Sequence, residues 1–147
     1  MGVVPNFDVA TPIGDRFAVG PFTADTWLLP HFVPNAGIRL STPRGVLAYT
    51  GDTGPSDAIV RLSEGADLFL SEATYVHEVP AADAPYLLTA RLAGQYARRA
   101  GAARLLLTHL WPGTDPTAAR QAAAEFFGQP VGIATPDLVS EVTGAAS

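Results

Sequence analysis

The fold is decided by one stretch of the chain, which reads Val46-Leu47-Ala48-Tyr49-Thr50-Gly51-Asp52-Thr53-Gly54. Its first half is apolar and β-prone, which predicts a strand over 46–50. This strand runs into an aspartate between two glycines, whose backbones allow a tight turn and the close approach of a ligand. Asp52 is therefore a candidate functional residue, although a carboxylate at this place also fits a simple cap on the helix that follows.

The residues before this stretch predict a β-hairpin. Gly37-Ile38-Arg39-Leu40-Ser41 alternates apolar and polar residues, which is the period of a half-buried strand. The next residues, 42–45, have the composition of a turn. Further upstream, 17–19 and 22–29 are predicted to be two strands divided by Gly20-Pro21. The first part of the chain therefore consists of strands.

After residue 52 the pattern changes to alternating helices and strands. Three helices are predicted: 56–64 with Ser56 as cap, 89–100 with Thr89 as cap, and 116–127 after Asp115-Pro116. Strands are predicted over 67–71, 104–108, 131–133 and 138–142. This order of elements predicts an α/β fold with a mixed β-sheet.

The composition excludes several classes of protein. Of the 147 residues, 48% are hydrophobic and 16% are charged, which excludes a disordered chain. No apolar run is long enough to span a membrane, cysteine is absent and no export signal is seen, so a cytoplasmic protein is expected. The net charge of −5, with nine arginines and no lysine, disfavours binding to a phosphate backbone.

Two histidines join Asp52 as candidates because they lie beside predicted strand ends. His109 follows the apolar run 105–108, and His31 precedes the strand that starts near residue 37. Imidazole and carboxylate groups are donors that suit Zn²⁺ or Mn²⁺. Each histidine alone is more often a structural residue, and composition does not show that the three converge. The third histidine, His77, lies in an acidic loop and is interpreted as a surface residue.

Two of these stretches resemble motifs of the metallo-β-lactamase fold, especially of its ribonuclease Z-like hydrolase branch. They are Thr50-Gly51-Asp52-Thr53 and Leu107-Thr108-His109, and His31 upstream of Gly37-Ile38-Arg39 matches a third motif. The resemblance extends from about Phe17 to Val142 and covers the C-terminal half of that fold. It implies half of an αββα sandwich, in which a mixed sheet carries helices on one face. A single, partial domain over 1–147 is therefore expected.

The resemblance also implies roles for individual residues. Asp52 would be the catalytic residue and would bridge two Zn²⁺ ions, with Mn²⁺ as the other metal considered. His31 would bind one ion and His109 the other. Glu72 and Thr53 would orient these ligands without binding the metal themselves, although Glu72 also fits a strand-end acid in a solvated loop. The implied activity is hydrolysis of a phosphodiester, an ester or a lactone by metal-activated water.

The sequence departs from the family pattern at two places. The motif His-x-His-x-Asp-His, which begins the family's metal site, is absent from a chain with three histidines. Leu87 stands where ribonuclease Z-like members often have a histidine. Together with the negative charge, this departure favours a small-molecule substrate over a nucleic acid.

The missing motif leaves an alternative to an enzyme. The chain would then be an inactive truncated or assembly module that needs an N-terminal half to complete a metal site. Half of a sandwich would also leave one apolar sheet face open. We therefore expect either a homo-oligomer or a missing N-terminal half to cover that face, and we expect no contact with a membrane.

Overall fold

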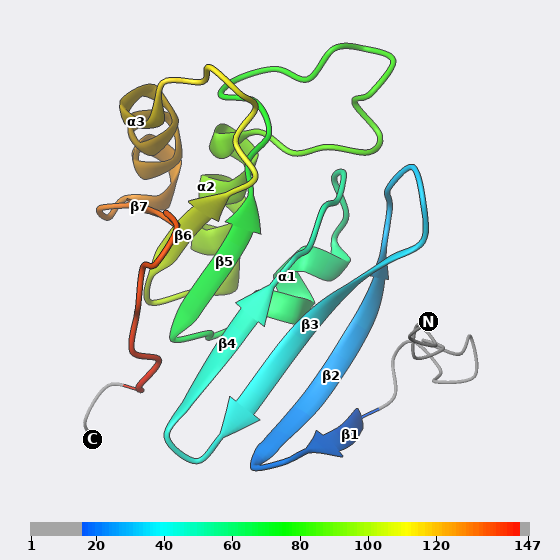
Figure 1. Cartoon of the computed structure of the whole chain (residues 1–147), viewed down its shortest axis with the longest axis vertical. Coiled ribbons are helices and arrows are strands. Elements are labelled where there is room, and N and C mark those ends of the chain that lie inside the picture. The colour runs from blue at the N-terminus through cyan, green and yellow to red at the C-terminus, as the bar shows by residue number, and fades with distance from the viewer. Residues whose placement is uncertain (1–15, 145–147) are drawn as a thin grey trace.

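The computed structural model describes residues 16–144, which form one mixed sheet of seven strands with three helices (Figure 1). The strands lie in sequence order across the sheet: β1 Arg16–Val19, β2 Phe22–Leu29, β3 Asn35–Thr42, β4 Gly45–Tyr49, β5 Leu68–Glu72, β6 Leu105–Thr108 and β7 Gly132–Ile133. The helices are α1 Ala58–Ser63, α2 Ala90–Ala100 and α3 Pro116–Phe127. The predicted α/β class and mixed sheet are confirmed.

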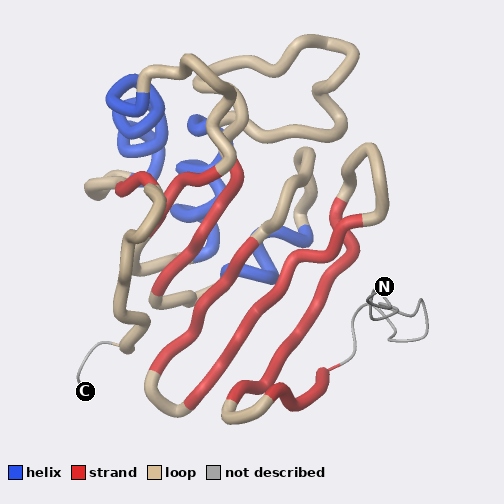
Figure 2. Tube along the Cα trace, in the orientation of Figure 1, coloured by secondary structure: helices blue, strands red, loops and turns tan. Residues whose placement is uncertain are grey.

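Strands β1 to β4 form an antiparallel meander, and β4 to β7 run parallel to one another, so β4 belongs to both parts of the sheet. The predicted hairpin is β3–β4, in which Thr42 pairs with Gly45 across a two-residue turn. From β4 onward each strand returns through one helix, so the chain runs β4-α1-β5-α2-β6-α3-β7 (Figure 2). Because parallel strands end at the same sheet edge, the segments that follow β4, β5 and β6 lie side by side.

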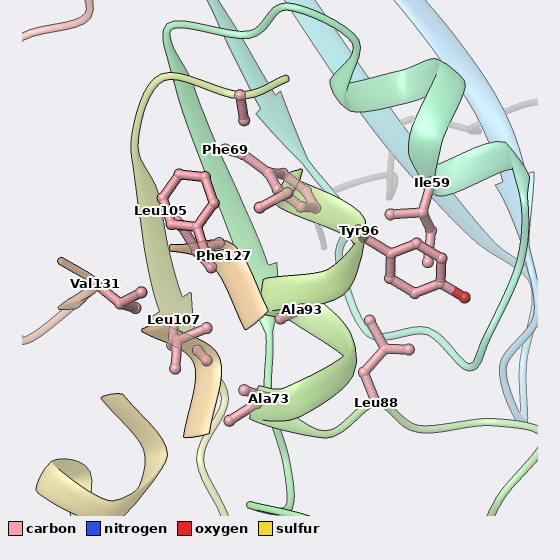
Figure 3. Packing of buried hydrophobic residues seen from close by; sticks show 14 of the residues in the cluster. Ile59, Phe69, Ala73, Leu88, Ala93, Tyr96, Leu105, Leu107, Phe127 and Val131 are labelled. Atoms are coloured by element: carbon pink, nitrogen blue, oxygen red, sulfur yellow. The ribbon is translucent and has the colours of Figure 1, made fainter. Parts of the chain in front are cut away.

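The core lies between one face of the sheet and the helices. Figure 3 shows Phe69 of β5, Leu105 of β6 and Phe127 of α3 gathered there, with Tyr96 of α2 beside Ile59 of α1. The apolar stripes of the helices are rich in alanine, so α2 and α3 pack closely: a side chain on Gly94 would collide with the backbone of Ala123. These helices therefore cover one face of the sheet, as predicted.

The opposite face of the sheet is only partly covered. The strand register aligns Tyr49, Leu70 and Leu106 in one row, and all three side chains are half-buried. On the antiparallel side, Val19 is 48% exposed and Leu28 is 58% exposed. Soluble domains rarely leave so many neighbouring apolar groups in water. Residues 16–144 therefore form half of a sandwich, in which one face of the sheet is open.

Local sequence signals explain where α2 and α3 begin. The Thr89 hydroxyl accepts a hydrogen bond from the backbone N–H of Leu92 at 3.0 Å, and Asp115 accepts one from Thr117 at 2.9 Å. The predicted start of α1 is wrong by two residues, because Ser56 caps a turn through the N–H of Ala58 and the helix begins only there. None of the helices in residues 16–144 is long and apolar enough to cross a membrane.

The predicted strand over 138–142 does not form. The turn at Asp137 has a left-handed backbone, with φ of 65°, and β7 already occupies the outer edge of β6. The segment is held instead by Arg104, whose guanidinium donates to the Ser140 hydroxyl at 2.9 Å and to the Glu141 carbonyl. Held there, the segment leaves apolar residues exposed: Val139 is 89% exposed.

Candidate metal centre

Three side chains from distant parts of the sequence meet where β2, β4 and β6 end. Asp52 lies in the segment after β4, His31 follows β2, and His109 follows β6. Nε2 of His31 is 3.9 Å from Oδ2 of Asp52, and Nδ1 of His109 is 3.6 Å from Oδ1 of Asp52. The three predicted candidates are therefore neighbours in space.

The backbone of the Asp52 segment is held by its neighbours. Gly51 adopts a left-handed conformation with φ of 60°, and a Cβ on it would lie 2.7 Å from Oδ1 of Asn35. The Asn35 side-chain amide donates to the Thr50 carbonyl at 3.1 Å. Only glycine combines this conformation with so close a contact. Asp52 itself stays 39% exposed, so its carboxylate is open to a ligand.

His31 is oriented by the loop that precedes α2. Its Nδ1 lies 2.8 Å from the carbonyl of Tyr86, and a carbonyl only accepts, so Nδ1 carries a proton, and in the neutral ring Nε2 keeps its lone pair. This loop is pressed against the Asp52 segment, because a Cβ on Gly54 would collide with the backbone of Pro85. Gly54 also donates to the Pro30 carbonyl at 2.7 Å. These contacts bind the segments of His31 and Asp52 together.

His109 has a left-handed backbone with φ of 57°, which is uncommon for a residue other than glycine. Its Nδ1 lies 3.0 Å from the hydroxyl oxygen of Thr74, in the segment that follows β5. Two residues later, Trp111 donates from its backbone N–H to the Thr74 carbonyl at 2.9 Å. The Trp111 ring also stacks on Tyr75, with centroids 5.8 Å apart. The segments after β5 and β6 are therefore joined at several points.

A fully buried carboxylate lies beneath these segments. Glu72 accepts hydrogen bonds from the backbone N–H of Thr53 at 3.0 Å, from the N–H of Thr74 at 3.0 Å and from the Thr74 hydroxyl at 2.8 Å. Burial raises the pKa of the Glu72 carboxyl above its usual value, and these hydrogen bonds partly oppose that shift. Burial, followed by the negative charges of Asp52 and Glu72, raises the pKa of the Tyr49 phenol.

The carboxylate of Asp52 lies between the two histidines. Its two oxygens face different histidines, Oδ2 toward His31 and Oδ1 toward His109. In residues 16–144, no group of three or more His, Cys, Asp or Glu side chains is arranged to hold one ion. Zinc sites use at least three protein ligands, so the donors of the described residues do not complete a zinc site by themselves.

The other predicted residues have different outcomes. Glu72 lies next to the site and is buried, so it is not a strand-end acid in a solvated loop. Thr53 acts through its backbone, since its hydroxyl donates only to the neighbouring Gly54 carbonyl at 2.9 Å. His77 is exposed, as predicted, and Leu87 is buried with 7% exposure.

Sequence reasoning missed Thr74 and Asn35, and it named Gly54 only as one of the two glycines around Asp52. Each acts through a contact with a residue far away in the chain: Thr74 with His109, Asn35 with Thr50, and Gly54 with Pro85. Only Gly54 carried a local signal, the glycine that closes the quoted stretch. Tertiary packing fixes the other two.

The chain is similar in sequence to known proteins. The family model described as beta-lactamase superfamily domain matches residues 6–110. An uncharacterized protein of Mycobacterium tuberculosis is 39% identical over 129 residues, which are 86% of this chain and 46% of that protein. A ribonuclease Z of Thermobifida fusca is 41% identical over 96 residues, which are 63% of this chain and 30% of that protein.

A solved structure agrees with these matches. The metallo-beta-lactamase fold protein YhfI from Bacillus subtilis has a TM-score of 0.78 and 30% identity, covering 83% of this chain and 50% of that protein. The chain thus spans half or less of the length of these relatives. The chain belongs to the beta-lactamase superfamily, and within it to the proteins of metallo-beta-lactamase fold that resemble ribonuclease Z hydrolases.

Proposed function

We propose that the chain supplies the bridging half of a two-metal hydrolase centre. Asp52 would bridge two ions, His31 would bind one of them, and His109 the other. One observation carries the proposal: the two oxygens of the Asp52 carboxylate face two different histidines, at 3.9 Å and 3.6 Å. A carboxylate that lies between two histidines is placed to bridge two ions, each held by one of the histidines.

The surroundings of each residue support the role assigned to it. The Tyr86 carbonyl fixes the proton of His31 on Nδ1 and leaves Nε2 to bind a metal. Asp52 and His109 are 39% and 46% exposed, which leaves room for ions and substrate. When bound, Zn²⁺ or Mn²⁺ would polarise the bond to be cleaved and supply hydroxide near neutral pH. The chain's own residues would hold and orient that centre.

The substrate class follows from charge and from the open site. A net charge of −5 repels a long phosphate backbone. A small molecule with one phosphodiester, ester or lactone bond avoids most of that repulsion. We therefore favour a small-molecule substrate over a nucleic acid.

Metal binding tests the proposal directly. Zn²⁺ and Mn²⁺ would be titrated into the metal-free chain by calorimetry, and the same titration repeated with Asp52→Asn. We expect Asp52→Asn to weaken binding by about tenfold or more, because the amide loses the negative charge shared by both positions. His77→Gln is the matched control, since it removes an exposed histidine. Equal affinity of Asp52→Asn and the parent chain would reject the proposal.

A second candidate is an assembly module without activity of its own. The observation that favours it is the lack, in the described part of the chain, of any group of three metal-binding side chains. An assay with bis(p-nitrophenyl) phosphate and with a lactone, at saturating metal, separates the candidates. We expect little or no turnover from the chain alone. Turnover that Asp52→Ala abolishes would contradict this expectation and would mean that a second subunit completes the centre.

A further inference from the structure

We propose that Thr74 is a positioning residue that sets the ring tautomer of His109. Through its hydroxyl, Thr74 would keep the His109 proton on Nδ1 and leave the lone pair on Nε2. The consequence for metal binding rests on the function proposed above, but the tautomer itself does not.

The Thr74 hydroxyl lies between two possible hydrogen-bond partners, Glu72 and His109. A hydroxyl carries one hydrogen and can donate one hydrogen bond. Oγ1 of Thr74 lies 2.8 Å from Oε2 of Glu72, to which it donates. The same Oγ1 lies 3.0 Å from Nδ1 of His109. Because its hydrogen is already used, Oγ1 accepts from Nδ1, and Nδ1 must carry a proton.

Glu72 holds the hydrogen of the Thr74 hydroxyl toward its own carboxylate. The backbone N–H of Thr74 also donates to Oε2 of Glu72, at 3.0 Å. Both polar groups of Thr74 are thus turned toward one carboxylate oxygen. Thr74 is 1% exposed and Glu72 is fully buried, so water does not compete for the hydroxyl. A carboxylate is a stronger acceptor than an imidazole nitrogen, which favours this arrangement over its reverse.

Asp52 is the other neighbour of Nδ1 on the His109 ring. Oδ1 of Asp52 lies 3.6 Å from the same Nδ1. At this distance Asp52 forms no hydrogen bond with Nδ1, so among the described residues the Thr74 hydroxyl is the group that holds the Nδ1 proton. His31 has the same tautomer, because its Nδ1 lies against the Tyr86 carbonyl. The chain thus presents two imidazoles whose Nε2 atoms both keep a lone pair.

This tautomer matters because a metal binds the nitrogen that has no proton. A neutral histidine in water prefers to carry its proton on Nε2, so a hydrogen bond at Nδ1 is needed to free Nε2. A peptide carbonyl provides that bond for His31. A side chain provides it for His109, which makes the His109 tautomer accessible to mutation.

Nitrogen NMR of the imidazole rings tests the proposal on the metal-free chain. Spectra would be recorded near pH 8, above the usual histidine pKa of about 6.5, and assigned with His31→Gln and His77→Gln. We expect the parent chain to show a protonated Nδ1 and a bare Nε2 at His109. In Thr74→Val the proton should move largely to Nε2, and Thr74→Ser should restore the parent spectrum.

Ser63→Ala is the control, because it removes another fully buried hydroxyl, one that donates only to the Ile59 carbonyl at 2.6 Å. It should leave the His109 signals unchanged. A bare Nδ1 in the parent chain, or a proton that stays on Nδ1 in Thr74→Val, would overturn the proposal. If Thr74→Val does not fold, Thr74→Ala gives the same comparison, because it also removes the hydroxyl that faces Nδ1 of His109.

Metal titration links this result to the proposed function. We expect Thr74→Val to weaken Zn²⁺ binding roughly 10-fold, as for other groups that orient a metal-binding histidine, and Thr74→Ser to restore it. A tautomer change in Thr74→Val, together with unchanged metal affinity in Asp52→Asn, would leave the role of Thr74 intact and reject the proposed metal centre. The two failures are therefore distinguishable.

Discussion

Replacing Glu72 with alanine should strongly destabilise the fold. The substitution leaves three buried donors without an acceptor: the N–H groups of Thr53 and Thr74 and the Thr74 hydroxyl. Each unpaired buried donor costs about 1–3 kcal/mol. Removal of the desolvated carboxylate offsets part of the sum, so we expect a loss of about 3–5 kcal/mol. That is a large share of the roughly 5–15 kcal/mol of a typical domain.

Urea denaturation followed by circular dichroism would measure this loss. Glu64→Ala is the matched control, because the Glu64 side chain is exposed and such changes usually stay within about 0.5 kcal/mol. A loss below about 1 kcal/mol in Glu72→Ala would refute the reasoning. It would mean that water reaches the three donors or that the strand ends rearrange around the smaller residue.

Three other changes follow from the same structure. Burial raises the pKa of the Glu72 carboxyl in the folded chain, so the unfolded chain loses this proton at a lower pH than the folded chain does. The free energy of unfolding should therefore fall as the pH rises above about 4.5, and denaturation of Glu72→Gln should show a flatter pH profile. Gly54→Ala should cost about 1–3 kcal/mol in thermal unfolding, since its Cβ meets the Pro85 backbone; Gly144→Ala, with no atom nearer than 3.6 Å, should be neutral. Sedimentation should show self-association at roughly 10–50 µM, driven by the open sheet face, whereas a monomer would mean that this face is covered within the chain.

The parts of the fold that were predictable are those set by neighbouring residues. Thr89 and Asp115 cap helices with their own side chains, two or three residues from the group they bind, so the sequence alone locates these starts. The strand predicted over 138–142 failed for the opposite reason. Its apolar residues suit a strand, but a strand forms only where the fold lays the segment along a partner edge, and no local pattern shows whether it does.

The candidate site likewise has residues that local sequence signals identify and contacts that only the fold produces. The glycines around Asp52 and the strand before His109 are local signals, and both residues were identified from them together with the family resemblance. The meeting of His31 with Asp52 depends on segments 21 residues apart that the fold brings together. The contact between Thr74 and His109 spans 35 residues. Such contacts leave no trace in spacing or composition, which is why Thr74 was not predicted.

The stacked rings of Tyr75 and Trp111 give the chain a built-in optical reporter. Trp111 is 55% exposed and lies two residues after His109, while its backbone is tied to Thr74. The other tryptophan, Trp27, packs against the core, so Trp27→Phe would leave one indole at the site. Any event that moves the His109 segment relative to Tyr75 would change the emission of this indole, and binding could be followed in real time without a chemical label.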